Sequence, residues 1–187
     1  MQFLGFRRAG SAAPTEVNDL SPLPVYVPTD APPLRVGRTL SSGYQQPDGI
    51  GTGAAYSDGE AIGKMIRFPG VLREDVRSGQ LYSATYLDLD DEGLQVDLHL
   101  FTTKLTYSPS DNNAYSPTDA DMMAYIGTVS FLSFYNLGAN QVSVGTFSPI
   151  AVANAPSVDV WGQVVARGAL NIAANNLPMF RLVWLAD

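Results

Sequence analysis

The chain contains no cysteine among its 187 residues, and this absence removes several kinds of chemistry. Disulfide bonds, thiolate nucleophiles and cysteine-ligated metal centres all need a residue that the chain lacks. It also has a single histidine, His99, so a metal site built on two histidines is excluded. The absence of cysteine is compatible with any compartment.

Positive charge is scarce, and long hydrophobic runs are missing. Eleven Lys and Arg stand against 18 Asp and Glu, which gives a formal net charge of −7. A surface that binds nucleic acid or an anionic membrane needs a basic patch, and only Arg7 and Arg8 are adjacent. No run of about 18 apolar residues occurs, so no membrane-spanning helix is expected. We therefore expect neither nucleic acid nor a membrane as a partner.

The N-terminal third of the chain, residues 1–58, is rich in proline and glycine, which disfavour helices and central strands. A short edge strand is expected at Leu23–Pro28. The segment also carries apolar side chains that need cover, so it is expected to be an extended arm lying on its own domain or on a neighbouring subunit. The candidate interaction residues of this arm are Val25, Tyr26, Val27, Leu34, Val36 and Leu40.

Residues 59–187 consist of short apolar segments separated by polar turns. Residues 94–100 alternate strictly between apolar and polar side chains, which indicates a half-buried strand. Without alternating helices, this pattern predicts an all-β sandwich or barrel. The other expected strands are Ala61–Phe68, Gln80–Leu89, Thr128–Tyr135, Gln141–Val152, Val158–Arg167 and Met179–Leu185, with Asp90–Gly93 forming a hairpin turn before residue 94.

One helix is expected, inside the acidic stretch Ser108–Phe131. Ser116 is suited to the N-cap and Pro117 to the first helical position, and Asp119 and Asp121 lie in the first turn. Carboxylates there interact favourably with the helix dipole. Met122, Met123 and Ile126 are expected to supply the buried face, and Gly127 to end the helix.

The acidic residues of this stretch do not have the spacing of a calcium-binding EF-hand loop, which needs oxygen ligands at positions 1, 3 and 5 and Gly at 6. From Asp111, position 5 is Tyr115; from Asp119, position 5 is Met123. We interpret Asp111–Asn113 as a turn, and an irregular calcium site remains the alternative.

Three further groups resemble catalytic or ligand sites. The run Asp88–Glu92 is expected to be a solvated turn rather than a glycosidase pair, which faces across a cleft. Asp97 and His99 share a strand face, but no G-x-S-x-G supplies a triad serine, so an exposed strand is expected. Gly49–Gly53 lacks the flanking strand and helix of a phosphate loop. No catalytic residue, metal or cofactor is therefore predicted.

The second half of the chain is rich in aromatic residues at strand spacing. Most are expected in the core, although some are candidates for an interface or for a sugar-binding platform. They are Phe131, Phe134, Tyr135, Phe147, Trp161, Phe180 and Trp184.

Several motifs occur in an order that resembles structural proteins of tailed-bacteriophage virions. A strand ending in D-x-x-L-F is followed by a P-S-D-N-x-A-Y-x-P-T-D-A-D segment and by a G-x-V-x-F strand. A late G-x-x-V-A-R-G strand and a final apolar strand follow. In this chain they are Asp97–Phe101, Pro109–Asp121, Gly127–Phe131, Gly162–Gly168 and Met179–Asp187, so the resemblance covers residues 59–187 and leaves the arm outside.

The resemblance implies a capsid decoration, or cement, protein with a jelly-roll-like β-sandwich. It implies a homo-oligomer, trimer or dimer, that is made in the host cytoplasm and binds the major capsid protein on the outer surface of the phage head. The second hypothesis is a carbohydrate-binding β-sandwich of a tail or surface fibre, which would use an exposed aromatic residue such as Trp161.

Overall fold

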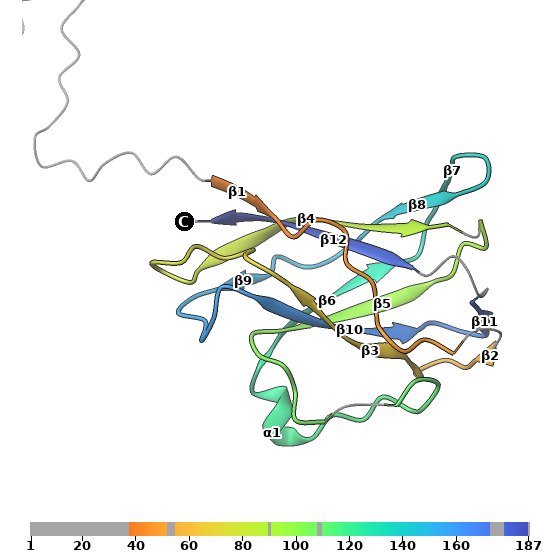
Figure 1. Cartoon of the computed structure of the whole chain (residues 1–187), viewed down its shortest axis with the longest axis horizontal. Helices are drawn as coiled ribbons and strands as arrows, with labels where there is room; N and C mark the ends of the chain where they lie inside the picture. The colour runs from red at the N-terminus through yellow and green to blue at the C-terminus, as the bar shows by residue number, and fades with distance from the viewer. Residues whose placement is uncertain (1–37, 52–54, 90, 108–109, 173–177, 187) are drawn as a thin grey trace, which may run out of the picture. The chain divides into compact units, whose positions relative to one another are not determined.

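The computed structural model describes residues 38–51, 55–89, 91–107, 110–172 and 178–186. Within these ranges the chain forms twelve β-strands and one short helix, α1 (Asp119–Met122) (Figure 1). The strands are β1 (Arg38–Ser41), β2 (Ala55–Tyr56), β3 (Ala61–Phe68), β4 (Gly79–Asp88), β5 (Val96–Phe101), β6 (Tyr125–Phe131), β7 (Tyr135–Asn136), β8 (Gln141–Val144), β9 (Ala151–Val152), β10 (Val160–Ala166), β11 (Leu170–Asn171) and β12 (Met179–Ala186).

Two antiparallel sheets pack as a sandwich. The larger sheet has six strands in the order β1-β12-β4-β8-β7, with β9 paired to β4. The smaller sheet has four strands in the order β3-β10-β5-β6, and Figure 1 shows it below the larger one, with α1 on the connection from β5 to β6. β2 and β11 form a separate two-stranded ribbon. The all-β sandwich with one short helix that the sequence predicts is therefore confirmed.

The core lies between the two sheets and is built from alternate residues of the long strands. In β12, Phe180, Leu182 and Trp184 are fully buried, while the residues between them are half-buried. Tyr86 of β4 stacks on Phe180 with ring centres 4.9 Å apart and meets Phe131 of β6 edge-on at 5.7 Å. Each such side chain contributes about 1.5–3 kcal/mol by leaving water. This aromatic cluster joins the larger sheet to the smaller one.

The chain crosses from one sheet to the other at Gly145. Its amide donates to Ala84 O in β4, whereas the next residue, Thr146, bridges to Ser130 in β6. A Cβ on Gly145 would overlap the Val129 side chain, so only glycine fits between the sheets here. The single strand expected over Gln141–Val152 is consequently wrong, because the crossing divides it into β8 and β9.

The hairpin expected at Asp90–Gly93 is also wrong. β4 lies in the larger sheet and β5 in the smaller one, so the turn connects the two sheets. The turn chemistry itself is as expected: Gly93 has φ +67°, and its amide donates to the Asp88 carboxylate at 2.8 Å. Strand alternation shows which side chains face the core, but it does not show which strand will be the hydrogen-bonded neighbour.

The described part of the proline-rich segment belongs to the sheets. β1 pairs with β12, which places Leu40 opposite Trp184, and Gln45 forms a further bridge to Phe180. β2 pairs with β11. Residues 38–41 and Gln45 of the expected arm thus pair with the larger sheet, and Ala55–Tyr56 pair with β11, while residues 1–37 and 52–54 lie outside the described residues.

Candidate functional site

Of the interaction residues expected in the arm, only Leu40 lies within the described residues. Val25, Tyr26, Val27, Leu34 and Val36, like the edge strand expected at residues 23–28, lie outside the described residues. Leu40 lies in β1, where its own domain half-buries the side chain.

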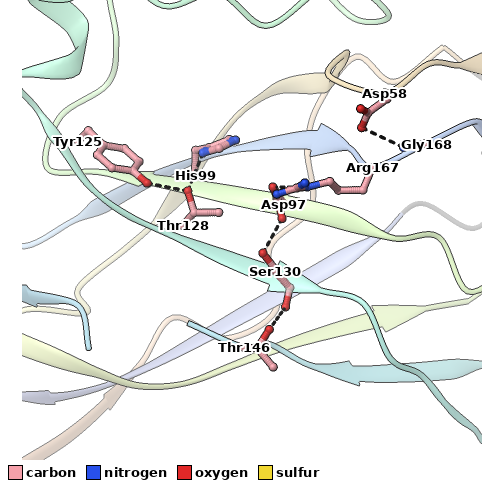
Figure 2. Close-up of polar contacts among 9 residues, drawn as sticks. All are labelled: Asp58, Asp97, His99, Tyr125, Thr128, Ser130, Thr146, Arg167 and Gly168. Carbon is pink, nitrogen blue, oxygen red and sulfur yellow. Dashed lines mark hydrogen bonds and ion pairs between the residues drawn. The ribbon is translucent and has the colours of Figure 1, made fainter. Parts of the chain in front are cut away.

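A row of polar side chains crosses the outer face of the smaller sheet (Figure 2). The buried carboxylate of Asp97 accepts a hydrogen bond from Ser130 at 2.7 Å and forms an ion pair with Arg167 at 2.6 Å. Ser130 in turn receives a hydrogen bond at its carbonyl from the Thr146 hydroxyl at 3.2 Å. These contacts join β5, β6 and the end of β10, so we assign Asp97 a role in holding neighbouring strands together.

His99 lies in the same row but has different partners. Its Nδ1 is 2.7 Å from the Thr128 hydroxyl, which is itself 2.7 Å from the Tyr125 hydroxyl. The Tyr115 ring stacks on the imidazole with centres 5.2 Å apart. Burial lowers the pKa of His99 below its ordinary value. The Asp97 carboxylate raises this pKa in part, and the Arg167 guanidinium lowers it again. Burial of the ring therefore favours the neutral form of His99.

The polar row differs from a serine–histidine–aspartate triad in its connections. In a triad the histidine bonds both the serine and the aspartate. Here Ser130 bonds the aspartate, and the aspartate's other partner is Arg167. His99 is half-buried beneath Tyr115, so the expected exposed strand is wrong for this position.

Asp111 lies in the expected turn and also holds three other segments. Its carboxylate accepts hydrogen bonds from Gly51 N at 2.7 Å, from Gly63 N at 2.6 Å and from the Tyr56 hydroxyl at 2.8 Å. Burial, and next the bond to Asp111, raise the pKa of Tyr56 well above its ordinary value, so its hydroxyl stays a donor. The acidic residue that looked like a calcium ligand thus satisfies protein donors.

The helix begins two residues later than expected. Thr118 is the N-cap, and its reciprocal partner in the capping box is Asp121, not the pair Ser116 and Asp119. Asp121 is buried and also accepts from Thr106 N at 2.9 Å and from the Thr106 hydroxyl at 2.8 Å. Hydrogen bonds from Thr118, and then from Thr106, lower the pKa of Asp121 to about 2. These extra donors favour Asp121 as the capping-box partner. Asp119, the expected partner, is exposed.

The buried helix face expected at Met122 and Met123 is also wrong. Their side chains are 42% and 89% exposed, and α1 ends at Met122, so Gly127 lies in β6 and does not end the helix. A single turn of helix on the connection between strands has little apolar surface to bury.

The acidic turn after β4 is held by side chains of β7 and β8. Asp88 is buried, and Asp91 receives hydrogen bonds from Asn136 at its carboxylate and from Gln141 at its carbonyl. Across the described residues, no cluster of three or more His, Asp or Glu side chains is arranged to hold a metal ion.

The aromatic residues divide into core and surface. Phe131, Phe180 and Trp184 are fully buried, and Phe134 and Phe147 are partly buried and pack against the hydrophobic core. Tyr135 is 66% exposed, and Trp161 is half-buried.

Tyr135 begins an apolar row on the outer face of the larger sheet. It is directly opposite Val142, which is opposite Leu87, which is opposite Met179. Residues directly opposite one another share a face. Their neighbours Tyr86 and Phe180 are buried, so the apolar row, Tyr135–Val142–Leu87–Met179, lies on the side away from the core.

The next outward row on this face begins with an apolar residue and is otherwise polar. Val144 is 56% exposed and is opposite Thr85, which is opposite Arg181. Arg181 lies over the Tyr44 ring, with its guanidinium carbon 5.0 Å from the ring centre. The outer face of an antiparallel sheet is ordinarily polar. This one has apolar side chains at most of these positions.

Trp161 lies at a cavity of about 510 Å³ at one side of the sandwich. Its walls come from β3, from the segment after β1, from the segment after β5 and from the start of β12. The lining residues are Tyr44, Gln45, Gln46, Asp48, Lys64, Met65, Ile66, Arg67, Lys104, Trp161 and Met179.

Comparison with protein-family models, with curated proteins and with solved structures finds no match to this chain. The resemblance to phage virion proteins therefore stays a prediction from the sequence motifs. The helix among the described residues is too short and polar to cross a membrane.

Proposed function

We propose that this chain is a non-enzymatic capsid decoration protein of a tailed bacteriophage, which binds the major capsid protein on the outer surface of the head and bridges its subunits. The order of motifs along residues 59–187 supports the family. The apolar row on the larger sheet, exposed at Tyr135 and half-buried at Val142, Leu87 and Met179, supports attachment through this face.

The apolar row is the observation that carries the proposal. Exposed apolar patches of this kind mark protein interaction sites, because water contact costs free energy that a partner surface removes. A standard interface buries about 1,600 Å² in total. On a symmetric shell, an oligomer engages several equivalent sites, so each contact needs only modest affinity. The formal charge of −7 suits the outside of a shell whose inner side faces DNA.

The test is binding of purified protein to shells of the encoding phage that lack it. The double variant Tyr135→Lys, Val144→Lys places two charges at exposed positions of this face, so we expect shell binding to fall at least tenfold while the sandwich stays folded. Met123→Lys is the control. That side chain is 89% exposed and lies on the connection from β5 to β6 of the smaller sheet, away from the apolar row. Unchanged shell binding by the double variant contradicts the proposal.

The arm requires a separate deletion. Because β1 begins at Arg38 and pairs with β12, removal of residues 1–58 would also remove sheet strands. The appropriate variant lacks residues 1–37, and we expect it to fold and to bind shells more weakly. Equal binding by this variant would mean that the arm takes no part in attachment. Sedimentation of both variants reports whether the trimer or dimer depends on the same surfaces.

Carbohydrate binding is the second candidate function. The observation that favours it is the cavity beside Trp161, where an aromatic ring lies next to amide and charged side chains. Binding on a glycan array that disappears in Trp161→Ala, with the fold retained, supports this function; an array without any signal contradicts it.

A further inference from the structure

Both lysines of the chain line the same cavity. The sequence contains two lysines, Lys64 and Lys104, and each is exposed at the cavity beside Trp161. In a chain with a net charge of −7, this is a local concentration of flexible positive charge.

The strand arrangement brings the two lysines to the same cavity. Lys64 lies in β3, and Lys104 follows β5, the strand that is separated from β3 by β10. The segment after β5 returns towards β3, where Leu105 N donates to the Met65 sulfur at 3.4 Å. Trp161 of β10 lies between, opposite Arg67 on one side and Phe101 on the other. The Lys104 ammonium is 5.8 Å from the centre of the Trp161 ring.

The charges that line the cavity leave an excess of positive charge. Arg67 is paired with Asp159 at 2.6 Å. Among the described residues, neither Lys64 nor Lys104 has a carboxylate within ion-pair distance. Asp48 is the one acidic residue of the lining, and its carbonyl accepts from Lys64 N at 2.8 Å. Two ammonium groups against one carboxylate favour a ligand with a single negative charge.

The remaining lining groups restrict the chemistry of that ligand. The volume of about 510 Å³ is that of a small-molecule site. Trp161 offers an aromatic face on which the C–H face of a pyranose ring can pack, whereas Arg181 already lies over the Tyr44 ring. Gln45 and Gln46 offer amide donors and acceptors for hydroxyl groups, and Asp48 offers a carboxylate acceptor.

We propose that this cavity binds an acidic sugar residue of the hexuronate type. The pyranose packs on Trp161, its carboxylate lies between the ammonium groups of Lys64 and Lys104, and its hydroxyls bond Asp48 and the two glutamines. This inference deepens the second candidate function and does not depend on attachment to a capsid.

The experiment exploits the small number of lysines. Reductive methylation with labelled formaldehyde keeps each ammonium charged and gives one NMR signal for each lysine, which Lys64→Gln and Lys104→Gln assign. Glucuronate is then titrated into the full chain. We expect both lysine signals to shift and the fluorescence of half-buried Trp161 to change. Fully buried Trp184 provides a constant background.

Two probes separate the sugar from its charge. Glucose carries the ring without the carboxylate, and acetate carries the carboxylate without the ring, so each is expected to bind at least tenfold more weakly than glucuronate. Acetate binding equal to that of glucuronate would overturn the assignment of a sugar. Absence of any shift with glucuronate would overturn the site itself.

Variants test the residues. Lys104→Gln keeps most of the side-chain stem and is expected to weaken glucuronate binding about tenfold, or about 1.4 kcal/mol. Arg73→Gln removes one positive charge outside the cavity and is expected to bind as the unaltered chain does. Equal affinity of Lys104→Gln and the unaltered chain would contradict the proposal. Shell binding by Lys104→Gln reports on capsid attachment separately, so failure of either proposal is recognised without the other.

Discussion

Replacement of Asp111 by alanine removes one carboxylate on which three segments of the chain converge. The buried side chain of Tyr56 and the buried amide of Gly63 both donate to it, and Gly51 donates from an exposed loop. Water replaces the acceptor for Gly51, but the other two donors lose their partner inside the protein. Gly63 has φ +60°, and a Cβ there would lie 2.8 Å from Asp48 O, so this segment is closely packed around the buried amide.

The expected loss of stability follows from these two donors. A buried donor without an acceptor costs about 1–3 kcal/mol, and hydrogen bonds to charged groups lie at the upper end. We therefore expect Asp111→Ala to lower the free energy of unfolding by about 3 kcal/mol. Domains of this kind have about 5–15 kcal/mol in total, so the variant should still fold. Asp111→Asn keeps the shape but turns one acceptor into a donor, and about half the loss is expected.

The assay is urea unfolding of the full chain, followed by tryptophan fluorescence. Asp58→Ala is the matched control, since Asp58 is exposed and accepts one hydrogen bond, from Gly168 N at 3.2 Å. A double-mutant cycle with Tyr56→Phe should give a coupling energy of about 1–2 kcal/mol. A change below about 0.5 kcal/mol in Asp111→Ala, or additive effects in the cycle, would refute the reasoning.

Two further predictions concern packing and pH. Gly145→Ala forces a Cβ against Val129 and Phe131 between the sheets, so the urea midpoint should fall by the equivalent of about 1–3 kcal/mol; an unchanged midpoint would show that the crossing has free space. His99, the single histidine, gives one imidazole NMR signal, whose pKa should lie below the ordinary value of about 6.5 because the side chain is buried. The unfolded chain then binds more protons, so stability is complete above about pH 6.5 and declines as pH falls towards the folded-state pKa. His99→Gln should lack this decline, and a measured pKa above 6.5 would contradict the burial argument.

The strands were predictable where one face is buried and the other is not. Residues 61–68 form β3 as expected, and alternate residues of β12 enter the core. The pairing of strands was not predictable, because a turn such as Asp88–Gly93 closes in the same way whether the next strand joins the same sheet or the facing one. The position of Gly145 between the sheets depends on Ala84 of β4, which accepts its amide, and on Val129 of β6, whose side chain packs against it. These two strands are distant from each other in the sequence.

The candidate sites were less predictable than the fold. A capping box was expected, but its position moved from Ser116 to Thr118 because Thr106, from a preceding segment, adds two hydrogen bonds to Asp121. Asp111 has the local signal of a turn, and nothing in its neighbourhood in the sequence indicates that Tyr56 and Gly63 will reach it.

The sequence by itself determined that the chain is an all-β protein without cysteine chemistry, because composition and alternation act locally and independently of strand order. Only the tertiary structure decided which surfaces these strands create. The apolar row requires four residues from four strands in one register, and the cavity requires a lysine of β3 and a lysine that follows β5 beside one tryptophan. Both arise from long-range strand pairing, whose energy is spread over the whole core and leaves no local pattern in the sequence.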